Sequence, residues 1–445
     1  MTLWLYSLLM WCLQPLVRAR LRWRARSEPV YGQRMEERFG DYGPPYEWPQ
    51  SSLDSDRFFV WVHAVSLGET RAAEVLVAQL RHALPGMRLL LTHGTATGHT
   101  QGASLLREGD VQVWQPWDSA YVVRRFLLHF KPRVGLLLET EVWPNLVAVC
   151  AQLKVPLCLV NARLSEKSQR QALRLAWLSR PAYAGLRAVW AQTQADAQRL
   201  YQVGAPVLGV TGNLKFDATP NSVQLEHGRL WRSALARPVI VFASSREGEE
   251  AILLKILKDI QALALVESAE SAIQRIAKDV QWLIVPRHPQ RFDAVADLCR
   301  AQGFSVSRRS QWSNVPQPAD IWLGDSLGEM AMFFGLSDVA LLGGSFAPLG
   351  GQNLIEAAAC GCPVVMGPHT FNFAHAAQLA IEAGAAFREG DMPHAVNKAL
   401  ALLCVESEFQ KTCAAAQALS MAHRGAAKRT ATALQNIIAA STRAT

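Results

Sequence analysis

Short apolar runs alternate along this chain with longer amphipathic stretches. This alternation predicts buried parallel strands joined by helices, the pattern of a doubly wound α/β sheet. The expected strands fall into two sets. The first set comprises Phe58–His63, Arg88–Thr92, Val111–Trp114, Val134–Leu138, Pro156–Val160, Ala188–Ala191 and Val207–Val210. The second set comprises Pro238–Ala243, Val280–Val285, Ile321–Leu323, Val339–Leu342 and Pro363–Met366.

A polar stretch at residues 217–229 separates the two sets of expected strands. A chain of 445 residues exceeds one ordinary core, so we expect two Rossmann-like domains of roughly 200 residues each. The expected boundaries are 27–222 and 223–445, with the two domains facing one another across a cleft. The Ala-rich stretch after Ala395 has a helical pattern and could cross back to brace the first domain.

The N-terminus combines an apolar run with a basic flank. Residues 1–17 contain no charged side chain, and a helix from Leu3 to Val17 would be roughly 22 Å long, below the roughly 30 Å of a hydrocarbon core. Five arginines follow directly, at positions 18, 20, 22, 24 and 26. We therefore expect residues 1–26 to be a retained membrane anchor that spans the bilayer or lies in its interface, with the rest of the chain on the cytoplasmic side.

The amino-acid composition indicates which kind of molecule the protein binds. Half of the residues are apolar, 18% are charged, and the formal net charge is +8, which favours an anionic partner: a nucleotide, a phosphorylated substrate or a membrane surface. Nucleic acid is not expected, because the basic residues are not interleaved with aromatic residues in any compact binding motif. The eight cysteines lie mostly in apolar runs, which is typical of reduced, buried residues.

Metal and cofactor motifs are missing from the sequence. It contains no His-Glu-x-x-His, Gly-x-Gly-x-x-Gly or Walker lysine pattern, and Cys360-Gly361-Cys362 has no second pair to complete a zinc site. Asp54-Ser55-Asp56 has the spacing of a metal-binding Asp-x-Asp pair, but it precedes the first expected strand, so we interpret it as a solvated loop. We expect neither a metal ion nor a cofactor.

The most informative stretch is the glycine-rich segment after the Val339–Leu342 strand. Gly343-Gly344 ends that strand, and Asn353 is placed to cap a following helix that begins at Leu354. A glycine loop that leads into a helix N-terminus favours a phosphate there. Glu356 could accept hydrogen bonds from ribose hydroxyls, or it could merely complete a capping box with Asn353.

Four acidic or basic residues in the first domain follow expected strands. Glu69 begins a helix after the first strand and could act as a general base or only complement the helix dipole. Glu139 and Glu141 follow the fourth strand; in an extended segment both would face the same side, where repulsion could raise one pKa, or one could pair with an arginine. Lys215 follows the last strand and could hold a phosphate or carboxylate, or be a solvated linker residue.

Two further turns in the second domain carry polar groups. Arg287 follows Pro286 at the end of an expected strand, where a guanidinium could grip a phosphate. Gly328-Glu329 opens a helix after the Ile321–Leu323 strand, and it could approach a base or ribose or simply be a capped helix start.

Several of these segments together resemble the 3-deoxy-D-manno-octulosonic acid (Kdo) transferases, which are GT-B glycosyltransferases of lipopolysaccharide biosynthesis. The likeness follows the same order along the chain. It rests on His63–Glu69, Leu138–Asn145, Gly212–Asp217, Pro286–Pro289, Leu327–Glu329, Gly343–Glu356 and Met366–Phe373.

The resemblance implies transfer of Kdo from CMP-Kdo to the lipid A precursor, lipid IVA, at the inner membrane, with inversion and without a metal. It implies that Glu69 is the catalytic base and that Glu139 and Lys215 support the transition state. It implies CMP contacts at Pro286, Arg287, Leu327, Gly328, Glu329, Asn353, Leu354, Ile355 and Glu356.

Two positions depart from the family pattern. Ser245-Arg246 stands where the family often has a Thr-His pair, and Gln352 stands where a His often precedes the Asn. Two other functions are consistent with the sequence: a membrane-associated GT-B transferase that uses a UDP-sugar, or a non-catalytic nucleotide-binding module tethered to a membrane.

Overall fold

The computed structural model describes residues 2–44, 57–263, 271–313 and 315–442. The chain forms two compact units: unit 1 is Met1–Asp217 with Arg424–Thr445, and unit 2 is Ala218–His423. The division at 217/218 differs from the expected boundary at 222/223, which falls at the start of helix α9 (Ser222–Ser233). The Asp54-Ser55-Asp56 sequence lies outside the described residues.

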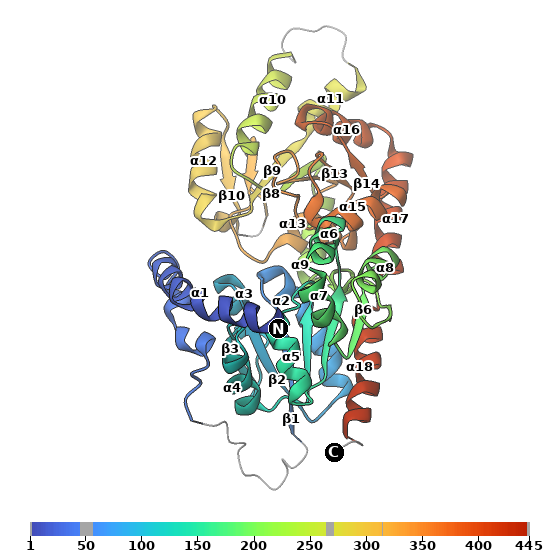
Figure 1. Cartoon of the computed structure of the whole chain (residues 1–445). Coiled ribbons are helices and arrows are strands. Elements are labelled where there is room, and N and C mark those ends of the chain that lie inside the picture. The colour runs from blue at the N-terminus through green and yellow to red at the C-terminus, as the bar shows by residue number, and fades with distance from the viewer. Residues whose placement is uncertain (1, 45–56, 264–270, 314, 443–445) are drawn as a thin grey trace. The chain divides into compact units, whose positions relative to one another are not determined.

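Unit 1 is built on a seven-stranded parallel sheet with the strand order β3-β2-β1-β4-β5-β6-β7 (Figure 1). Its strands are β1 (Phe58–His63), β2 (Met87–His93), β3 (Val111–Trp114), β4 (Val134–Leu138), β5 (Leu157–Ala162), β6 (Ala188–Ala191) and β7 (Val207–Val210). The helices between them are α2 (Leu67–Ala83), α3 (Ala96–Ala103), α4 (Ala120–Phe130), α5 (Pro144–Gln152), α6 (Glu166–Arg174), α7 (Ala176–Ala184) and α8 (Gln194–Gln202).

Strand β1 shows why these apolar runs form a buried sheet. Val60 and Val62 pack into one hydrophobic cluster, whereas Phe59 and Trp61 pack into another on the opposite face. Successive side chains of a strand point to opposite faces, so an uninterrupted apolar run is buried only where helices cover both faces. The strand carboxyl ends are therefore the edge of the sheet where polar residues can gather.

Unit 2 repeats this architecture, with the parallel order β10-β11-β9-β8-β12-β13-β14. Its strands are β8 (Val239–Ser245), β9 (Gln281–Pro286), β10 (Val306–Arg308), β11 (Ile321–Leu323), β12 (Val339–Leu342), β13 (Val364–Met366) and β14 (Ala386–Arg388). Its helices are α9, α10 (Glu249–Leu263), α11 (Ala272–Asp279), α12 (Phe292–Ala301), α13 (Met330–Leu336), α14 (Leu354–Ala359), α15 (Ala374–Glu382), α16 (Met392–Cys404) and α17 (Glu406–Ala422).

The last helix, α18 (Ala426–Thr442), belongs to unit 1, where it packs on α2. Its start is tied to the end of the first segment of unit 1, because Asp217 accepts hydrogen bonds from the backbone N–H groups of Gly425 and Ala427. Leu434 is fully buried in the same cluster as the strand residues of β1. The C-terminal segment is thus part of the core of unit 1.

The N-terminal helix α1 (Thr2–Arg24) docks on unit 1 through polar contacts. The Tyr6 hydroxyl donates to Asp118 at 2.8 Å, and the Trp117 indole donates to the Met10 carbonyl at 2.8 Å. No helix in the described part of the chain is both long and apolar enough to cross a bilayer.

The cysteines are all free thiols. The expectation of buried residues is confirmed for Cys150, Cys158, Cys299, Cys360 and Cys362. It is wrong for the cysteine at position 12, which is exposed on helix α1.

Candidate functional site

Glu69 lies in the first turn of α2, at the carboxyl edge of the unit 1 sheet. Ser66 caps this helix by accepting a hydrogen bond from the Glu69 N–H. The Glu69 carboxylate accepts a hydrogen bond from the Val65 N–H at 2.8 Å and another from the Ser66 hydroxyl at 3.0 Å. The side chain therefore takes part in helix capping, and these two bonds also fix the position of its carboxylate.

The surroundings of Glu69 disfavour its charged form. Burial, followed by the nearby charges of Glu139 and Glu141, raises the pKa of Glu69 to about 7, although the Val65 and Ser66 hydrogen bonds oppose the rise. A carboxyl with a pKa near neutrality can exchange a proton at physiological pH, which suits a general acid or base.

Glu139 is a buried carboxylate between two cations. Lys215 Nζ lies 2.9 Å from Glu139 Oε1, and Arg163 Nε lies 2.8 Å from Oε2. Lys215 reaches Glu139 from the 3-10 helix η3 (Leu214–Asp217). The expectation of an extended segment after β4 is wrong, because Glu139 has a φ of 57° and lies in a turn. The structure confirms the alternative in which one of the two carboxylates pairs with an arginine.

Glu141 belongs to a second polar group at the same edge. The Trp143 indole donates to Glu141 Oε2 at 2.9 Å, and His63 Nε2 lies 4.0 Å from that oxygen. The pKa of Glu141 is raised, mainly by burial and also by the charge of Glu139. Burial lowers the pKa of His63 to about 3, so the imidazole is neutral at physiological pH.

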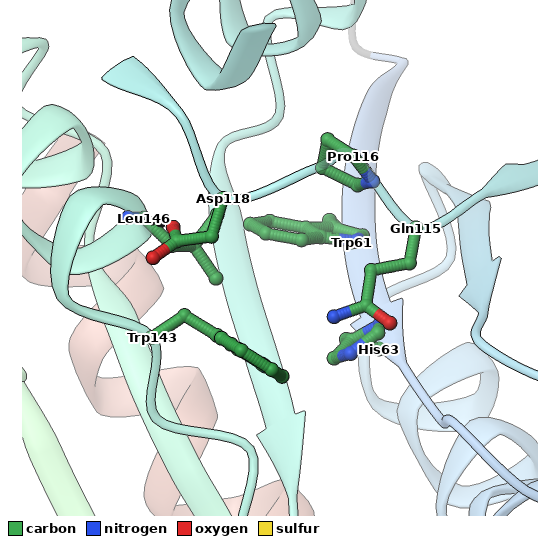
Figure 2. A pocket seen from close by; sticks show the side chains of 7 residues that line it. All are labelled: Trp61, His63, Gln115, Pro116, Asp118, Trp143 and Leu146. Atoms are coloured by element: carbon green, nitrogen blue, oxygen red, sulfur yellow. Dashed lines mark hydrogen bonds between the residues drawn. The ribbon is translucent and has the colours of Figure 1, made fainter. Parts of the chain in front are cut away.

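A narrow pocket adjoins this group. Figure 2 shows the Asp118 carboxylate and the Trp143 indole on one side of it, and Gln115 and His63 on the other. His63 is almost fully buried, and its Nε2 has no hydrogen-bond partner within the described residues. Asp118 accepts from the backbone N–H groups of Asn145 and Leu146 and so caps α5. Polar side chains from β1, from the end of β3 and from the start of α5 thus meet at one edge.

In unit 2, Arg287 follows β9 at the carboxyl edge of the sheet. Its Nε donates to Gln352 Oε1 at 3.2 Å, which joins the end of β9 to the segment before α14. Burial and the positive charges of Arg246, Arg287 and Arg291 lower the pKa of His288. Arg291 is paired with the buried Glu250 through two hydrogen bonds, of 2.7 and 3.0 Å. The arginines at this edge create a positive field that suits an anion.

The two departures from the family pattern lie in this basic region. Gln352 is the partner of Arg287, and Arg246 is one of the arginines around His288. Ser245 is fully buried and its hydroxyl donates to Glu250 at 2.7 Å.

The Leu327-Gly328-Glu329 turn precedes α13. Leu327 is 71% exposed, and Gly328 has a φ of 78°, which a residue with a side chain rarely adopts. The Glu329 carboxylate pairs with Arg309 at 2.8 Å. The helix begins at Met330, directly after the expected Gly328-Glu329 start, and Glu329 provides no side-chain cap.

Asn353 caps α14 as expected, because its side chain accepts from the Ile355 N–H at 3.2 Å. The helix runs from Leu354 to Ala359, and Leu354 and Ile355 are buried. The glycine loop before it differs from the expectation. The N–H groups of Gly344, Phe346 and Ala347 all donate to the Glu249 carboxylate instead of lying open to a phosphate.

Sequence reasoning did not assign a role to Glu249. A signal was present, because Gly248-Glu249 begins a helix after a strand, as Gly68-Glu69 does. It also did not place His63 and Trp143 around Glu141, since those contacts join residues from different strand ends. The described residues contain no cluster of three or more His, Cys, Asp or Glu side chains that could hold a metal ion.

Comparison with known proteins gives consistent results for both sequence and fold. A family profile described as 3-deoxy-D-manno-octulosonic-acid transferase (kdotransferase) matches residues 33–218. The 3-deoxy-D-manno-octulosonic acid transferase of Bordetella pertussis is 48% identical over 383 residues, covering 85% of this chain and 87% of that protein. The protein of that name from Haemophilus influenzae is 31% identical over 434 residues, covering 95% of each chain.

A glycosyltransferase structure from Rickettsia africae shares the fold, with a TM-score of 0.54 and 13% identity; the match covers 86% of this chain and 98% of that one. The two parallel sheets with their helices are therefore of the GT-B type. With the sequence identities above, we conclude that this chain is a glycosyltransferase and belongs to the family of 3-deoxy-D-manno-octulosonic acid transferases.

Proposed function

We propose that the chain transfers Kdo from CMP-Kdo to the lipid A precursor, lipid IVA, in lipopolysaccharide biosynthesis, with inversion at the anomeric carbon and without a metal ion. The observation that carries this proposal is Glu69, a carboxylate fixed by two hydrogen bonds and with a pKa raised to about 7. The carboxylate takes the proton from an acceptor hydroxyl while the hydroxyl oxygen attacks the anomeric carbon of Kdo. The bond from that carbon to the CMP phosphate breaks, and CMP leaves.

Two other residues of unit 1, Glu139 and Lys215, stabilise the charge that develops in this step. Lys215 and Arg163 hold Glu139 in one position, so this carboxylate is already oriented before the substrate binds. Preorganised charges avoid the reorganisation that water would need. A carboxylate near the anomeric carbon stabilises the positive charge that accumulates there as the bond to phosphate breaks.

The donor contacts lie in unit 2. Arg287 is hydrogen-bonded to Gln352 and belongs, with Arg246, to the positive region around His288. A guanidinium can bind phosphate oxygens through two parallel hydrogen bonds. The other proposed CMP contacts are Pro286, Leu327, Gly328, Glu329, Asn353, Leu354, Ile355 and Glu356. The Glu329 carboxylate is already paired with Arg309. We therefore expect the backbone of the Leu327-Gly328-Glu329 turn, and not the Glu329 side chain, to contact the nucleoside.

The transfer assay that tests the proposal uses purified protein, CMP-Kdo and lipid IVA, with mass spectrometry of the glycolipid. Glu69→Gln should lower turnover roughly 10²- to 10⁴-fold and leave CMP affinity, measured by calorimetry, unchanged. Glu74→Gln, an exposed carboxylate on the same helix, is the matched control. Addition of EDTA should leave the rate unchanged.

Two outcomes point to other functions. Calorimetry that favours UDP over CMP would indicate a UDP-sugar donor, and CMP binding without any glycosylated product would indicate a binding module without catalysis. Substantial transfer by Glu69→Gln would remove Glu69 from the base role.

An apolar surface on unit 1 supports a lipid acceptor and an inner-membrane location. The outward face of α1 carries Trp4 and Trp11, which are 65% and 66% exposed. A pocket of about 160 Å³ between α1, α5 and α7 is lined by apolar side chains, among them Leu3, Val147 and Trp177. A helix that combines exposed tryptophans with a basic segment, here the arginines from position 18 on, is typical of one that lies in a membrane interface. We infer that α1 lies in the cytoplasmic face of the inner membrane.

Flotation with vesicles tests this location. The Trp4→Ser/Trp11→Ser double variant should bind vesicles of anionic phospholipid less well than the unmodified protein, and Trp190→Phe, at a buried position in β6, should bind as the unmodified protein does. Equal flotation of the α1 variant would contradict the interfacial location.

A further inference from the structure

The glycine loop after β12 donates its backbone N–H groups to a side chain of the same unit. The Gly344 N–H lies 2.8 Å from Glu249 Oε2, and the N–H groups of Phe346 and Ala347 lie 3.2 and 3.3 Å from Oε1. A fourth donor, the Arg246 N–H, lies 2.9 Å from Oε2. Each carboxylate oxygen of Glu249 thus accepts two backbone hydrogen bonds, and the residue is 2% exposed.

This loop is in turn hydrogen-bonded to the segment before α14, which leads into proposed donor contacts, and to the segment that follows β13. The Gly351 N–H donates to the Gly344 carbonyl at 2.8 Å, directly before Gln352 and α14. The His369 N–H donates to the Ser345 carbonyl at 3.0 Å, and the Gly367 N–H donates to the Ser345 hydroxyl at 2.8 Å. A change in the position of residues 344–347 would therefore move both neighbouring segments.

Close packing leaves the loop few alternative positions. A Cβ at Gly343 would lie 2.2 Å from the Ser244 carbonyl oxygen, and one at Gly367 would lie 2.4 Å from the Ser345 carbonyl oxygen. Glu249 joins the start of α10 to the loop after β12 at the point where these backbones approach one another.

We propose that Glu249 is a built-in anion for this cluster of N–H groups, and that it is a positioning residue which holds residues 344–347 in the form that donor binding requires. The link to donor binding rests on the proposed function, whereas the anion site itself does not. The N–H groups that a glycine loop would offer to a phosphate are occupied by a carboxylate, so the donor phosphate must be bound by side chains such as Arg287 and by other backbone groups.

The chemistry of the site requires a carboxylate. N–H groups that are shielded from water and lack an acceptor are costly; of these four, the Gly344 N–H is buried and the other three are partly buried. Hydrogen bonds to a charged acceptor are also stronger than neutral ones. A glutamine at this position has one acceptor oxygen and an NH₂ group that would face the N–H donors. An alanine leaves a space that lacks the Cγ and the carboxylate, which together correspond to acetate.

Chemical rescue tests the anion site. We expect Glu249→Ala to lower the melting temperature and added acetate to restore it in a saturable way, measured by thermal unfolding against sodium chloride at equal ionic strength. Glu247→Ala removes an exposed carboxylate from the same turn and should show neither effect. Recovery with chloride equal to that with acetate, or the absence of any recovery, would overturn the proposal.

Donor binding provides the second measurement. CMP affinity, measured by calorimetry, should fall about tenfold or more in Glu249→Ala and recover with acetate. If Glu249→Ala does not fold, Glu249→Gln serves instead, and it should lose CMP affinity without rescue. Unchanged CMP affinity in a folded variant would overturn the positioning role. Failure of the unmodified protein to bind CMP would instead contradict the proposed function, while the acetate effect on Glu249→Ala would still identify the anion site.

Discussion

At the scale of single residues, the protonation of Glu69 is set by its neighbours. The groups that face it from outside its own helix are the carboxylates of Glu139 and Glu141 and the Val65 N–H, and burial is the largest influence. If Glu69 is the base, it must be deprotonated to act, so kcat/KM should rise as the pH increases through about 7.

Glu141→Gln provides a prediction about that pH dependence. Removal of a nearby negative charge makes the ionised form of Glu69 less unfavourable, so the rising limb of the kcat/KM profile should move to lower pH. Glu108→Gln, at an exposed position elsewhere in unit 1, should leave the profile unchanged. If the rising limb of the kcat/KM profile stays at the same pH in Glu141→Gln, the coupling between the carboxylates of Glu69 and Glu141 is contradicted.

Glu69→Gln gives a second prediction, for stability. The pKa of Glu69 is raised from 4.5 to about 7 on folding, so the folded state binds its proton more tightly and the contribution to stability is lost as the pH rises through that window. The difference in melting temperature between the variant and the unmodified protein should therefore favour the variant more at pH 8 than below pH 4.5. A gain of roughly 2–4 °C at pH 8 corresponds to about 1 kcal/mol. Thermal unfolding at both pH values measures the difference, and a gain that does not depend on pH would contradict it.

At the scale of elements, Asp118 connects helix α1 to the start of α5. It accepts from the Tyr6 hydroxyl and from the N–H groups of Asn145 and Leu146. The segment from Glu139 to α5 contains Glu141 and Trp143, so a single carboxylate joins helix α1 to the segment that borders the site.

Asp118→Ala should therefore destabilise unit 1. The loss of a helix cap and of the Tyr6 hydrogen bond should cost about 1–3 kcal/mol, measured by urea unfolding. Glu108→Ala, at an exposed position, should change stability by less than about 0.5 kcal/mol. Equal midpoints for the two variants would show that Asp118 does not stabilise this junction.

At the scale of the whole molecule, unit 1 is completed by a segment from the other end of the chain. Leu434 of α18 is fully buried among residues of β1 and α2. Leu434→Ala should cost about 2–5 kcal/mol in unit 1 and leave CMP affinity, for which the proposed contacts lie in unit 2, unchanged, as urea unfolding and calorimetry would show. Lys428→Ala, exposed on the same helix, is the control. Loss of CMP affinity in Leu434→Ala would contradict a role for Leu434 that is confined to unit 1.

Most strands could be predicted from the sequence because parallel strands covered on both faces are continuous apolar runs. β1, β3, β4, β6, β7, β11 and β12 begin and end where the sequence predicted. The edge strands β10 and β14 were missed. Each has only three residues and ends in an arginine, so neither forms an apolar run.

The candidate site was predicted less completely. Strand ends followed by glycine or by a charged residue located Glu69, Glu139, Lys215 and Arg287, because the carboxyl ends of parallel strands share one edge. The sequence alone could not show that Glu139 is held by Lys215 and Arg163, since those residues come from different strand ends.

The sequence by itself determined the two parallel sheets, their strand order along the chain and the edge at which the polar residues lie, because hydrophobic periodicity and helix capping are local properties. Only the tertiary structure decided which donor meets which acceptor. It assigned the N–H groups of the glycine loop to Glu249 in place of a phosphate, and it raised the pKa of Glu69 by burying it near two carboxylates. Both effects depend on groups that are distant in the chain and adjacent in space, which no local pattern contains.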